Sequence, residues 1–143
     1  MHLAALLLAA LTITPMTEAA AQQFSEGQVW NYRARLEEPT STLLINKVEV
    51  EPKLGEVYHI SVRWVRVKNR HAPNGVSTEL PHFPVSRKTL ELSVTTLVGQ
   101  SPANPDYLEG YATWRKAYEE GNAGVFTIPV AEIVGFVEST LSQ

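Results

Sequence analysis

The stretch that decides the fold runs from residue 56 to residue 68 and reads Glu56-Val57-Tyr58-His59-Ile60-Ser61-Val62-Arg63-Trp64-Val65-Arg66-Val67-Lys68. Apolar and polar residues alternate as far as Trp64, which is typical of a β-strand that buries one face. At Val65 the alternation shifts by one residue, and a β-bulge near Trp64 and Val65 would restore one continuous core face. The polar residues would then share the opposite, open face: His59, Ser61, Arg63, Arg66 and Lys68.

Two further strands are predicted before this stretch. Residues 30–36 alternate with Trp30 and Tyr32 on one face, and residues 41–51 alternate with Leu44 and Val48 turned inward. Short turns at residues 37–40 and 52–55 separate the three strands, and both turns contain a proline. Three strands joined in this way predict an antiparallel meander.

The C-terminal half changes to helical spacing. A first helix is predicted from an N-cap at Ser86 to Gly99, and a second from Asn104 and Pro105 to Gly121. A short strand over residues 125–128 and a third helix from Pro129 complete the chain. The fold class predicted is α+β, with a three- to four-stranded antiparallel sheet in the order βββ-αα-β-α and helices packed on one face. Aromatic residues at helical spacing are expected to bury the second helix against the core: Tyr107, Tyr111, Trp114 and Tyr118.

The first 21 residues contain a pattern that predicts where the protein is located. An apolar run from Leu3 to Leu11 is followed by Pro15 and by three alanines that end at Ala21. This pattern indicates a secretory signal peptide over residues 1–21, although a buried N-terminal helix is the alternative. The run is shorter than the roughly 20 residues that cross a bilayer, so no membrane span is expected. Removal of the signal would leave residues 22–143 as a single α+β domain in the periplasm or outside the cell.

Composition excludes several classes of function. The 143 residues carry a formal charge of −3, which gives no overall attraction to nucleic acid. The absence of cysteine excludes thiol catalysis, disulfide bonds and cysteine-ligated zinc. No motif for a cofactor or for a known catalytic set is found, so no cofactor is expected.

Several blocks of sequence together resemble a family of small exported bacterial proteins with no assigned activity. They cover nearly all of residues 22–143: Gly27-Gln28-Val29-Trp30 with Tyr32; Lys68-Asn69 with Ala72-Pro73 and Gly75; Leu80-Pro81-His82 with Pro84-Val85-Ser86; Glu109-Gly110-Tyr111 with Trp114-Arg115; and Ala123-Gly124-Val125-Phe126-Thr127-Ile128 with Glu132-Ile133-Val134. The resemblance implies export but no activity, cofactor or catalytic residue.

A candidate contact surface lies after the phase shift. Positive charge is concentrated from Arg63 to His71, and a long proline-rich loop is expected over Asn69–Val85. The predicted partner-binding residues are Arg63, Arg66, Lys68, Arg70, His71, His82 and Phe83. The alternative is a solvated outer face in which Glu49 or Glu51 pairs with Arg63 across strands.

These observations favour a soluble, non-catalytic binding module whose partner is a cell-envelope or secreted protein or another anionic ligand. An inhibitor or an immunity-type protein is one form of this hypothesis. The rival hypothesis is a small hydrolase or metal-dependent enzyme that uses His71, Glu79 and His82. A third hypothesis is a structural envelope component, which a self-complementary apolar patch would favour. The sequence does not define the oligomeric state.

Overall fold

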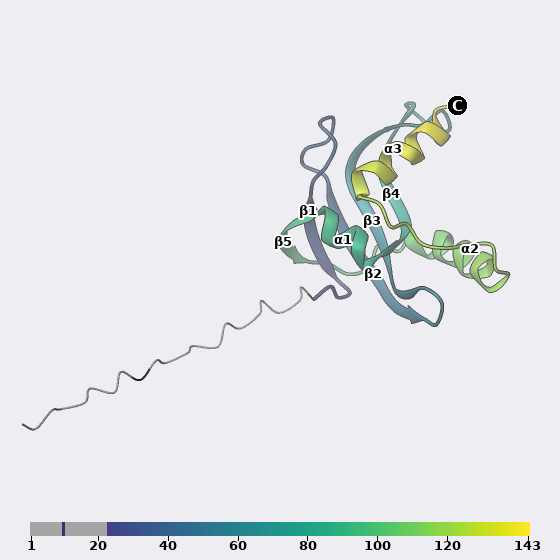
Figure 1. Ribbon diagram of the computed structural model, residues 1–143. Helices are drawn as coiled ribbons and strands as arrows, with labels where there is room; N and C mark the ends of the chain where they lie inside the picture. The colour runs from purple at the N-terminus through teal and green to yellow at the C-terminus, as the bar shows by residue number, and fades with distance from the viewer. Residues whose placement is uncertain (1–9, 11–22) are drawn as a thin grey trace, which may run out of the picture.

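Four consecutive strands form an antiparallel meander in the computed structural model, which describes residue 10 and residues 23–143 (Figure 1). The predicted signal peptide therefore lies outside the described residues, apart from residue 10. The four strands are β1 (Gln28–Tyr32), β2 (Thr42–Glu51), β3 (Gly55–Lys68) and β4 (Val76–Ser86). Helix α1 (Arg87–Ser93) then carries the chain across the sheet to β5 (Val94–Gln100), which pairs antiparallel with β1.

The described part of the chain is thus an α+β fold with one five-stranded sheet in the order β4-β3-β2-β1-β5. Helices α2 (Tyr107–Glu119) and α3 (Val130–Leu141) follow β5. The predicted fold class is confirmed, but the predicted count of three to four strands and the predicted order of elements are wrong. Residues 125–128 contribute only a single parallel bridge between Phe126 and Val85.

The β-bulge in β3 is confirmed. The register of β3 with β4 shifts between Arg63 and Val67, and Trp64 adopts a left-handed backbone with φ of 57°. As a result, Val62, Val65 and Val67 all lie in the core, whereas Trp64 is 66% exposed. One extra residue in the strand therefore keeps a single apolar face in spite of the shifted alternation.

Strand β4 replaces most of the long loop predicted over Asn69–Val85. Only residues 69–75 form a loop, closed by a hydrogen bond from the amide of Asn69 to the carbonyl of Gly75 at 2.9 Å. The prolines Pro81 and Pro84 fit within β4 because it is an edge strand, where a missing N–H can face away from the ladder. The extended backbone expected around these prolines is real, but it belongs to a sheet.

Helix α1 is shorter than predicted. Ser86 is its N-cap, as expected, and the Ser86 side chain accepts a hydrogen bond from the amide of Thr89 at 3.2 Å. The helix ends at Ser93, and the residues predicted to continue it form β5 instead. Val94, Thr95 and Thr96 are β-branched and favour extended backbone, which explains the change of structure at this point.

Helices lie on both faces of the sheet, which corrects the prediction of helices on one face. The apolar core contains Ile60 and Val62 of β3 together with Leu90 of α1 and Ile133 of α3. Helix α2 lies on the opposite side of β3, where Trp114 packs against His59 with ring centroids 4.9 Å apart. No helix among the described residues is long and apolar enough to cross a membrane.

Candidate functional site

The outward side of the bulge presents a basic and aromatic surface, which we call the cationic surface: Arg63, Trp64, Arg66, Lys68 and Val76. The side chains of Arg63, Arg66 and Lys68 form no ion pair with a carboxylate of the described residues. Cross-strand pairing of Arg63 with Glu49 or Glu51 is therefore not observed, because Glu49 contacts His59 and Glu51 contacts Arg115.

Two shallow hollows are lined in part by residues of the cationic surface, and Trp64 lines the smaller one. One has a volume of about 70 Å³ and is lined by Arg63, Trp64, Thr78 and Glu79. The other has a volume of about 360 Å³ and is lined by Glu37, Arg66, Lys68 and Val76. In this second hollow, Glu37 Oε2 lies 3.9 Å from Arg35 Nε. The cationic surface thus combines an aromatic ring, three unpaired cations and local concavity.

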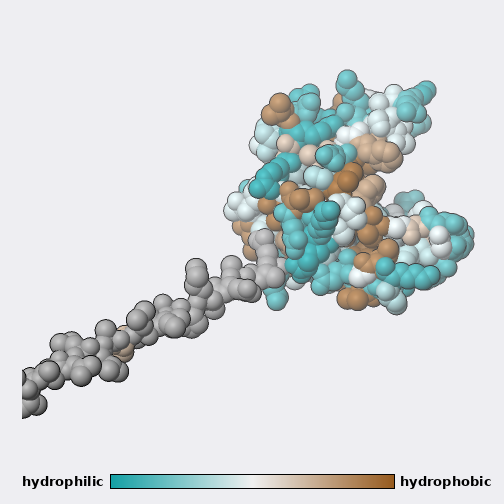
Figure 2. Space-filling model, viewed as in Figure 1, coloured by the Kyte–Doolittle hydropathy of each residue, from teal (hydrophilic) through white to brown (hydrophobic). Residues whose placement is uncertain are grey.

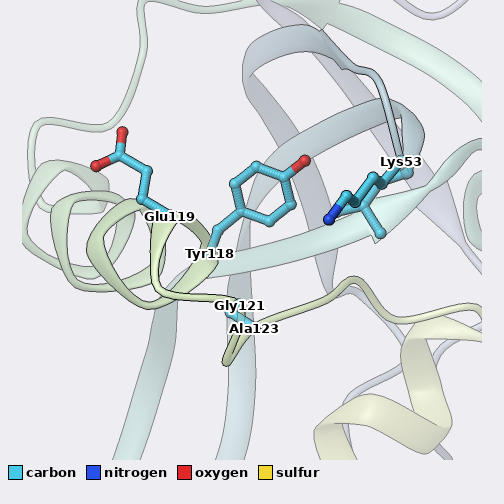
Figure 3. Close-up of a pocket in the computed structure, with 6 residues that line it drawn as sticks. Lys53, Tyr118, Glu119, Gly121 and Ala123 are labelled. Atoms are coloured by element: carbon cyan, nitrogen blue, oxygen red, sulfur yellow. The ribbon is translucent and has the colours of Figure 1, made fainter.

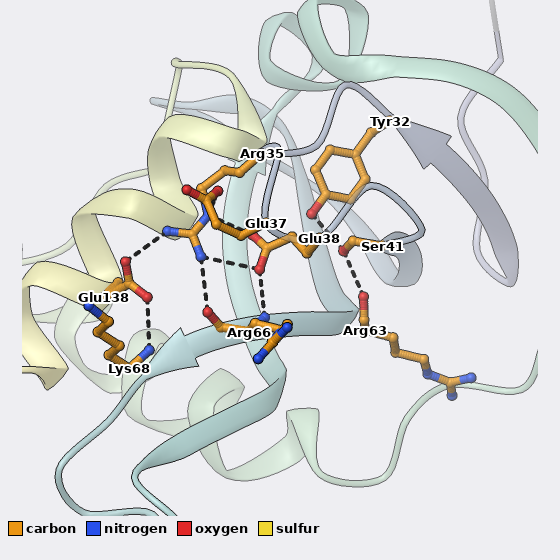
Figure 4. Close-up of polar contacts among 9 residues, drawn as sticks. All are labelled: Tyr32, Arg35, Glu37, Glu38, Ser41, Arg63, Arg66, Lys68 and Glu138. Carbon is orange, nitrogen blue, oxygen red and sulfur yellow. Dashed lines mark hydrogen bonds and ion pairs between the residues drawn. The ribbon is translucent and has the colours of Figure 1, made fainter.

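A buried carboxylate holds the backbone on the C-terminal side of the bulge (Figure 4). The Glu38 side chain is inaccessible to solvent and accepts a hydrogen bond from the amide of Arg66 at 2.6 Å. It also accepts two hydrogen bonds from the guanidinium of Arg35, at 2.6 and 3.1 Å, and these contacts raise the pKa of Arg35. A charged group removed from water needs such partners, so Glu38 and Arg35 form one structural unit.

The same guanidinium extends the network to α3. Arg35 donates to Glu138 at 3.0 Å, and Glu138 accepts from the amide of Lys68 at 2.8 Å. Both contacts lower the pKa of Glu138, with the backbone hydrogen bond from Lys68 as the larger cause. The nearby carboxylates therefore bind backbone amides and Arg35, which leaves the charged ends of Arg66 and Lys68 available to other molecules.

The N-terminal side of the bulge is held by Tyr32 of β1 and by Ser41, which precedes β2. Ser41 donates to the carbonyl of Arg63 at 2.6 Å, and the Tyr32 hydroxyl lies 2.7 Å from Ser41. Burial raises the pKa of Tyr32 to about 12, so this phenol stays protonated at neutral pH. Figure 4 shows the Arg63 side chain extending away from these contacts. Trp64 is therefore fixed in its strained conformation by hydrogen bonds on both sides.

The other predicted contact residues are not part of this surface. Arg70 binds the C-terminal residue Gln143, and its amide donates to the carbonyl of Leu141 at 3.1 Å. His71 is exposed in the hairpin loop. Phe83 is only 5% exposed and belongs to the apolar core, which contradicts its predicted role in partner contact. Of the predicted partner-binding residues, only Arg63, Arg66 and Lys68 of β3 therefore lie on the cationic surface.

His82 is part of a polar cluster beneath α2. His59 Nδ1 and His82 Nε2 lie 2.9 Å apart, and His59 Nε2 lies 2.7 Å from Glu49 Oε1. A carboxylate can only accept, so His59 donates to Glu49 and, when neutral, accepts from His82. His59 is completely buried, and Ser61 is too, which corrects the prediction of an open face at these two positions.

Burial controls the charge of this histidine pair. It lowers the pKa of His82 to about 4, with the charge of His59 as the second cause, and it also lowers the pKa of His59. The ring of Tyr111 packs edge-on against His59 at 4.8 Å, and its hydroxyl donates to Glu49 at 3.2 Å. The aromatic stripe of α2 thus covers neutral histidines instead of the predicted apolar core.

His71, Glu79 and His82 do not form the site that the enzyme hypothesis requires. His82 bonds to His59, Glu79 accepts from the side chain of Asn104, and His71 lies in the exposed loop. Within residues 23–143, no group of three or more histidines and carboxylates is placed to hold a metal ion. The geometry does not favour metal-dependent chemistry at these three residues.

Two other hollows are less suited to recognition. One, of about 360 Å³, lies between the β2–β3 turn and the end of α2, where Lys53 and Tyr118 point toward each other and Glu119 points away (Figure 3). Another, of about 260 Å³, is lined by residues 124–126, and Figure 2 shows apolar atoms in the notch between α2 and α3 where this segment runs. Neither hollow contains a cluster of unpaired charged groups.

Comparison with family models, with curated proteins and with solved structures finds no match to this chain. The resemblance to small exported bacterial proteins therefore stays a prediction, and the functional argument depends on the geometry of the site.

Proposed function

We propose that this protein is an exported, non-catalytic binding module whose cationic surface takes an acidic segment of a partner protein. The observation that carries this proposal is Trp64, a large aromatic residue with a left-handed backbone and 66% exposure, placed between Arg63 and Arg66. For a bulky residue this conformation is a clear outlier and costs about 1–2 kcal/mol. Glycine would adopt this backbone conformation without strain. The presence of tryptophan at position 64 is therefore best explained by contact between its exposed ring and a partner.

The composition of the surface supports this role. Tryptophan and arginine are the residues that most often dominate the binding energy of protein interfaces. The unpaired cations of Arg63, Arg66 and Lys68 would attract carboxylates of the partner, while Trp64 and Val76 supply apolar contact. Desolvating a cation is costly unless a counter-charge replaces the lost water, which selects an acidic partner over a neutral one.

Charge reversal provides the test. We expect poly-L-glutamate to bind the protein in low salt, followed by the fluorescence of Trp64, and Arg66→Glu to weaken this binding by about tenfold. The other two tryptophans, Trp30 and Trp114, are 3% and 7% exposed, so iodide quenching reports mainly on Trp64. The matched control is Lys88→Glu, which makes the same change of charge at an exposed position of α1.

Two outcomes would contradict the proposal. Equal loss of affinity in both variants would mean that overall charge, and no defined surface, controls binding. Stronger binding of a sulfated polysaccharide than of poly-L-glutamate, with the same dependence on Arg66, would replace the acidic protein segment by a glycan as the ligand.

A further inference from the structure

Strand β5 forms an open edge of the sheet. It pairs with β1 on one side, and within residues 23–143 no strand pairs with its other side. Figure 1 shows β5 at the margin of the molecule, on the side away from α2. Six of its seven residues are exposed. Its backbone N–H and C=O groups on that side are therefore open to another strand.

Of the usual protections of an edge strand, β5 has only the irregular register of its pairing with β1. Its sequence reads Val94-Thr95-Thr96-Leu97-Val98-Gly99-Gln100, with no charged residue and no proline. Leu97 and Val98 are 46% and 49% exposed. Natural proteins place lysine, proline or inward charges on edges to prevent strand pairing, and β5 has none of these.

We infer that β5 pairs antiparallel with β5 of a second copy of this chain, which extends the sheet across a two-fold axis. An isologous interface requires a surface that complements itself. A two-fold axis at Leu97 would place Thr96 opposite Val98, and Val94 opposite Gln100, so each contact is between uncharged residues. No like charges oppose each other in this register or in any shifted one, because the strand carries no charge.

The strength of the contact follows from its size. Two register shifts against β1 bend β5, so pairing between copies involves the middle of the strand more than its ends. A ladder of a few residues buries less than the roughly 1,000 Å² of a stable interface. The dimer is therefore weak and forms with increasing protein concentration.

Sedimentation velocity over a concentration series tests this inference. The wild-type protein is expected to shift from monomer to dimer as its concentration rises. Leu97→Lys places two ammonium groups opposite each other on the axis, and should raise the concentration needed for dimerisation by about tenfold or more. Leu108→Lys makes the same substitution at a leucine of α2 that is 55% exposed, and should leave self-association unchanged.

Hydrogen exchange of the wild-type protein provides a second test of dimerisation that requires no variant. Amides of residues 94–100 should exchange more slowly at high protein concentration, while those of the hairpin loop 69–75 should not change. A monomer at every concentration, a dimer that Leu97→Lys does not weaken, or exchange in β5 that is independent of concentration would each overturn the inference. Each of these results is independent of the binding of poly-L-glutamate at the cationic surface.

Discussion

The two edges of the sheet are built in opposite ways. At one edge, β4 contains Pro81 and Pro84, α2 covers one of its faces through Gly110 and Tyr111 beside His82, and Asn104, which precedes α2, donates to Glu79. At the other edge, β5 contains neither proline nor charge, and six of its seven residues are exposed. One fold therefore contains both a strand protected from further pairing and a strand open to it.

This difference means that a partner can recognise the β4 side through side chains and the β5 side through backbone groups. Because β4 cannot readily accept a further strand, a partner that approaches this side meets the side chains of the cationic surface. A partner that approaches β5 meets backbone N–H and C=O groups with few polar side chains around them. The first arrangement suits an acidic partner of different sequence, whereas the second suits another copy of the chain.

The largest effect that separates the two edges is expected from pH. The pKa of His82 falls from 6.5 to about 4 on folding, so between these values the unfolded chain binds a proton that the folded protein does not. Stability is therefore fully present above pH 6.5 and is lost as the pH falls toward 4. At about 1.4 kcal/mol per pH unit, lowering the pH from 7.5 to 4.5 should reduce the free energy of unfolding by about 2–3 kcal/mol.

Urea unfolding between pH 7.5 and pH 4.5 measures this loss. His82→Gln keeps a donor for His59 but removes the titrating group, so it should flatten the pH dependence substantially. His71→Gln, at an exposed histidine of the hairpin loop, is the matched control and should keep the wild-type slope. A slope unaffected by His82→Gln would show that the histidine pair does not control the stability of the β4 side.

A smaller effect is expected from a methyl group at the β4 edge. A Cβ on Gly110 of α2 would lie 2.8 Å from the Cβ of His82, which is too close and involves an atom next to the backbone. Overpacking costs roughly 1–3 kcal/mol, whereas replacing glycine by alanine within a helix stabilises the helix by about 1 kcal/mol. Gly110→Ala should therefore lower the free energy of unfolding by about 1 kcal/mol, as measured by urea unfolding; a more stable variant would show that α2 is not held tightly against β4.

The smallest effect is expected from the same substitution at the β5 edge. A Cβ on Gly99 would have no atom of the described structure within 4 Å, and its backbone is not left-handed. Gly99→Ala should change the free energy of unfolding by less than about 0.5 kcal/mol. A large loss of stability, measured by urea unfolding at low protein concentration, would mean that β5 is packed more closely than its exposure indicates.

Local patterns in the sequence predicted much of the fold. The existence of β2 and β3, the bulge at Trp64 and the N-cap at Ser86 follow from neighbouring residues, and the structure confirms them. The inward face predicted for β2 is wrong at Leu44, because the register of β2 with β3 shifts between Ile45 and Lys47, so that Leu43 and Ile45 join Val48 at the core. The prolines of β4 led to the prediction of a loop, because a sequence does not show which strand lies at the edge of a sheet, where proline is tolerated. Helical and strand spacing also overlap around Leu97, where the β-branched residues were the better signal.

The site was less predictable because its contacts join distant parts of the chain. His59 carries the alternation of an exposed strand position, and only the packing of α2 shows that it is buried. The contact of Arg35 with Glu138 joins the loop between β1 and β2 to α3, and it has no sequence signature. The shift of alternation beside the basic residues nevertheless pointed to exposed positions for Arg66 and Lys68, whereas Arg63 is half-buried.

The substitution Trp64→Gly, assayed for both stability and binding, tests the proposed function most directly. Glycine adopts the left-handed backbone without strain, so urea unfolding should give a protein as stable as the wild type or about 1 kcal/mol more stable. Binding of poly-L-glutamate, measured by calorimetry, should fall by about tenfold or more because the aromatic anchor is lost. A variant that loses stability but binds with unchanged affinity would show that Trp64 serves the fold, and would contradict the account.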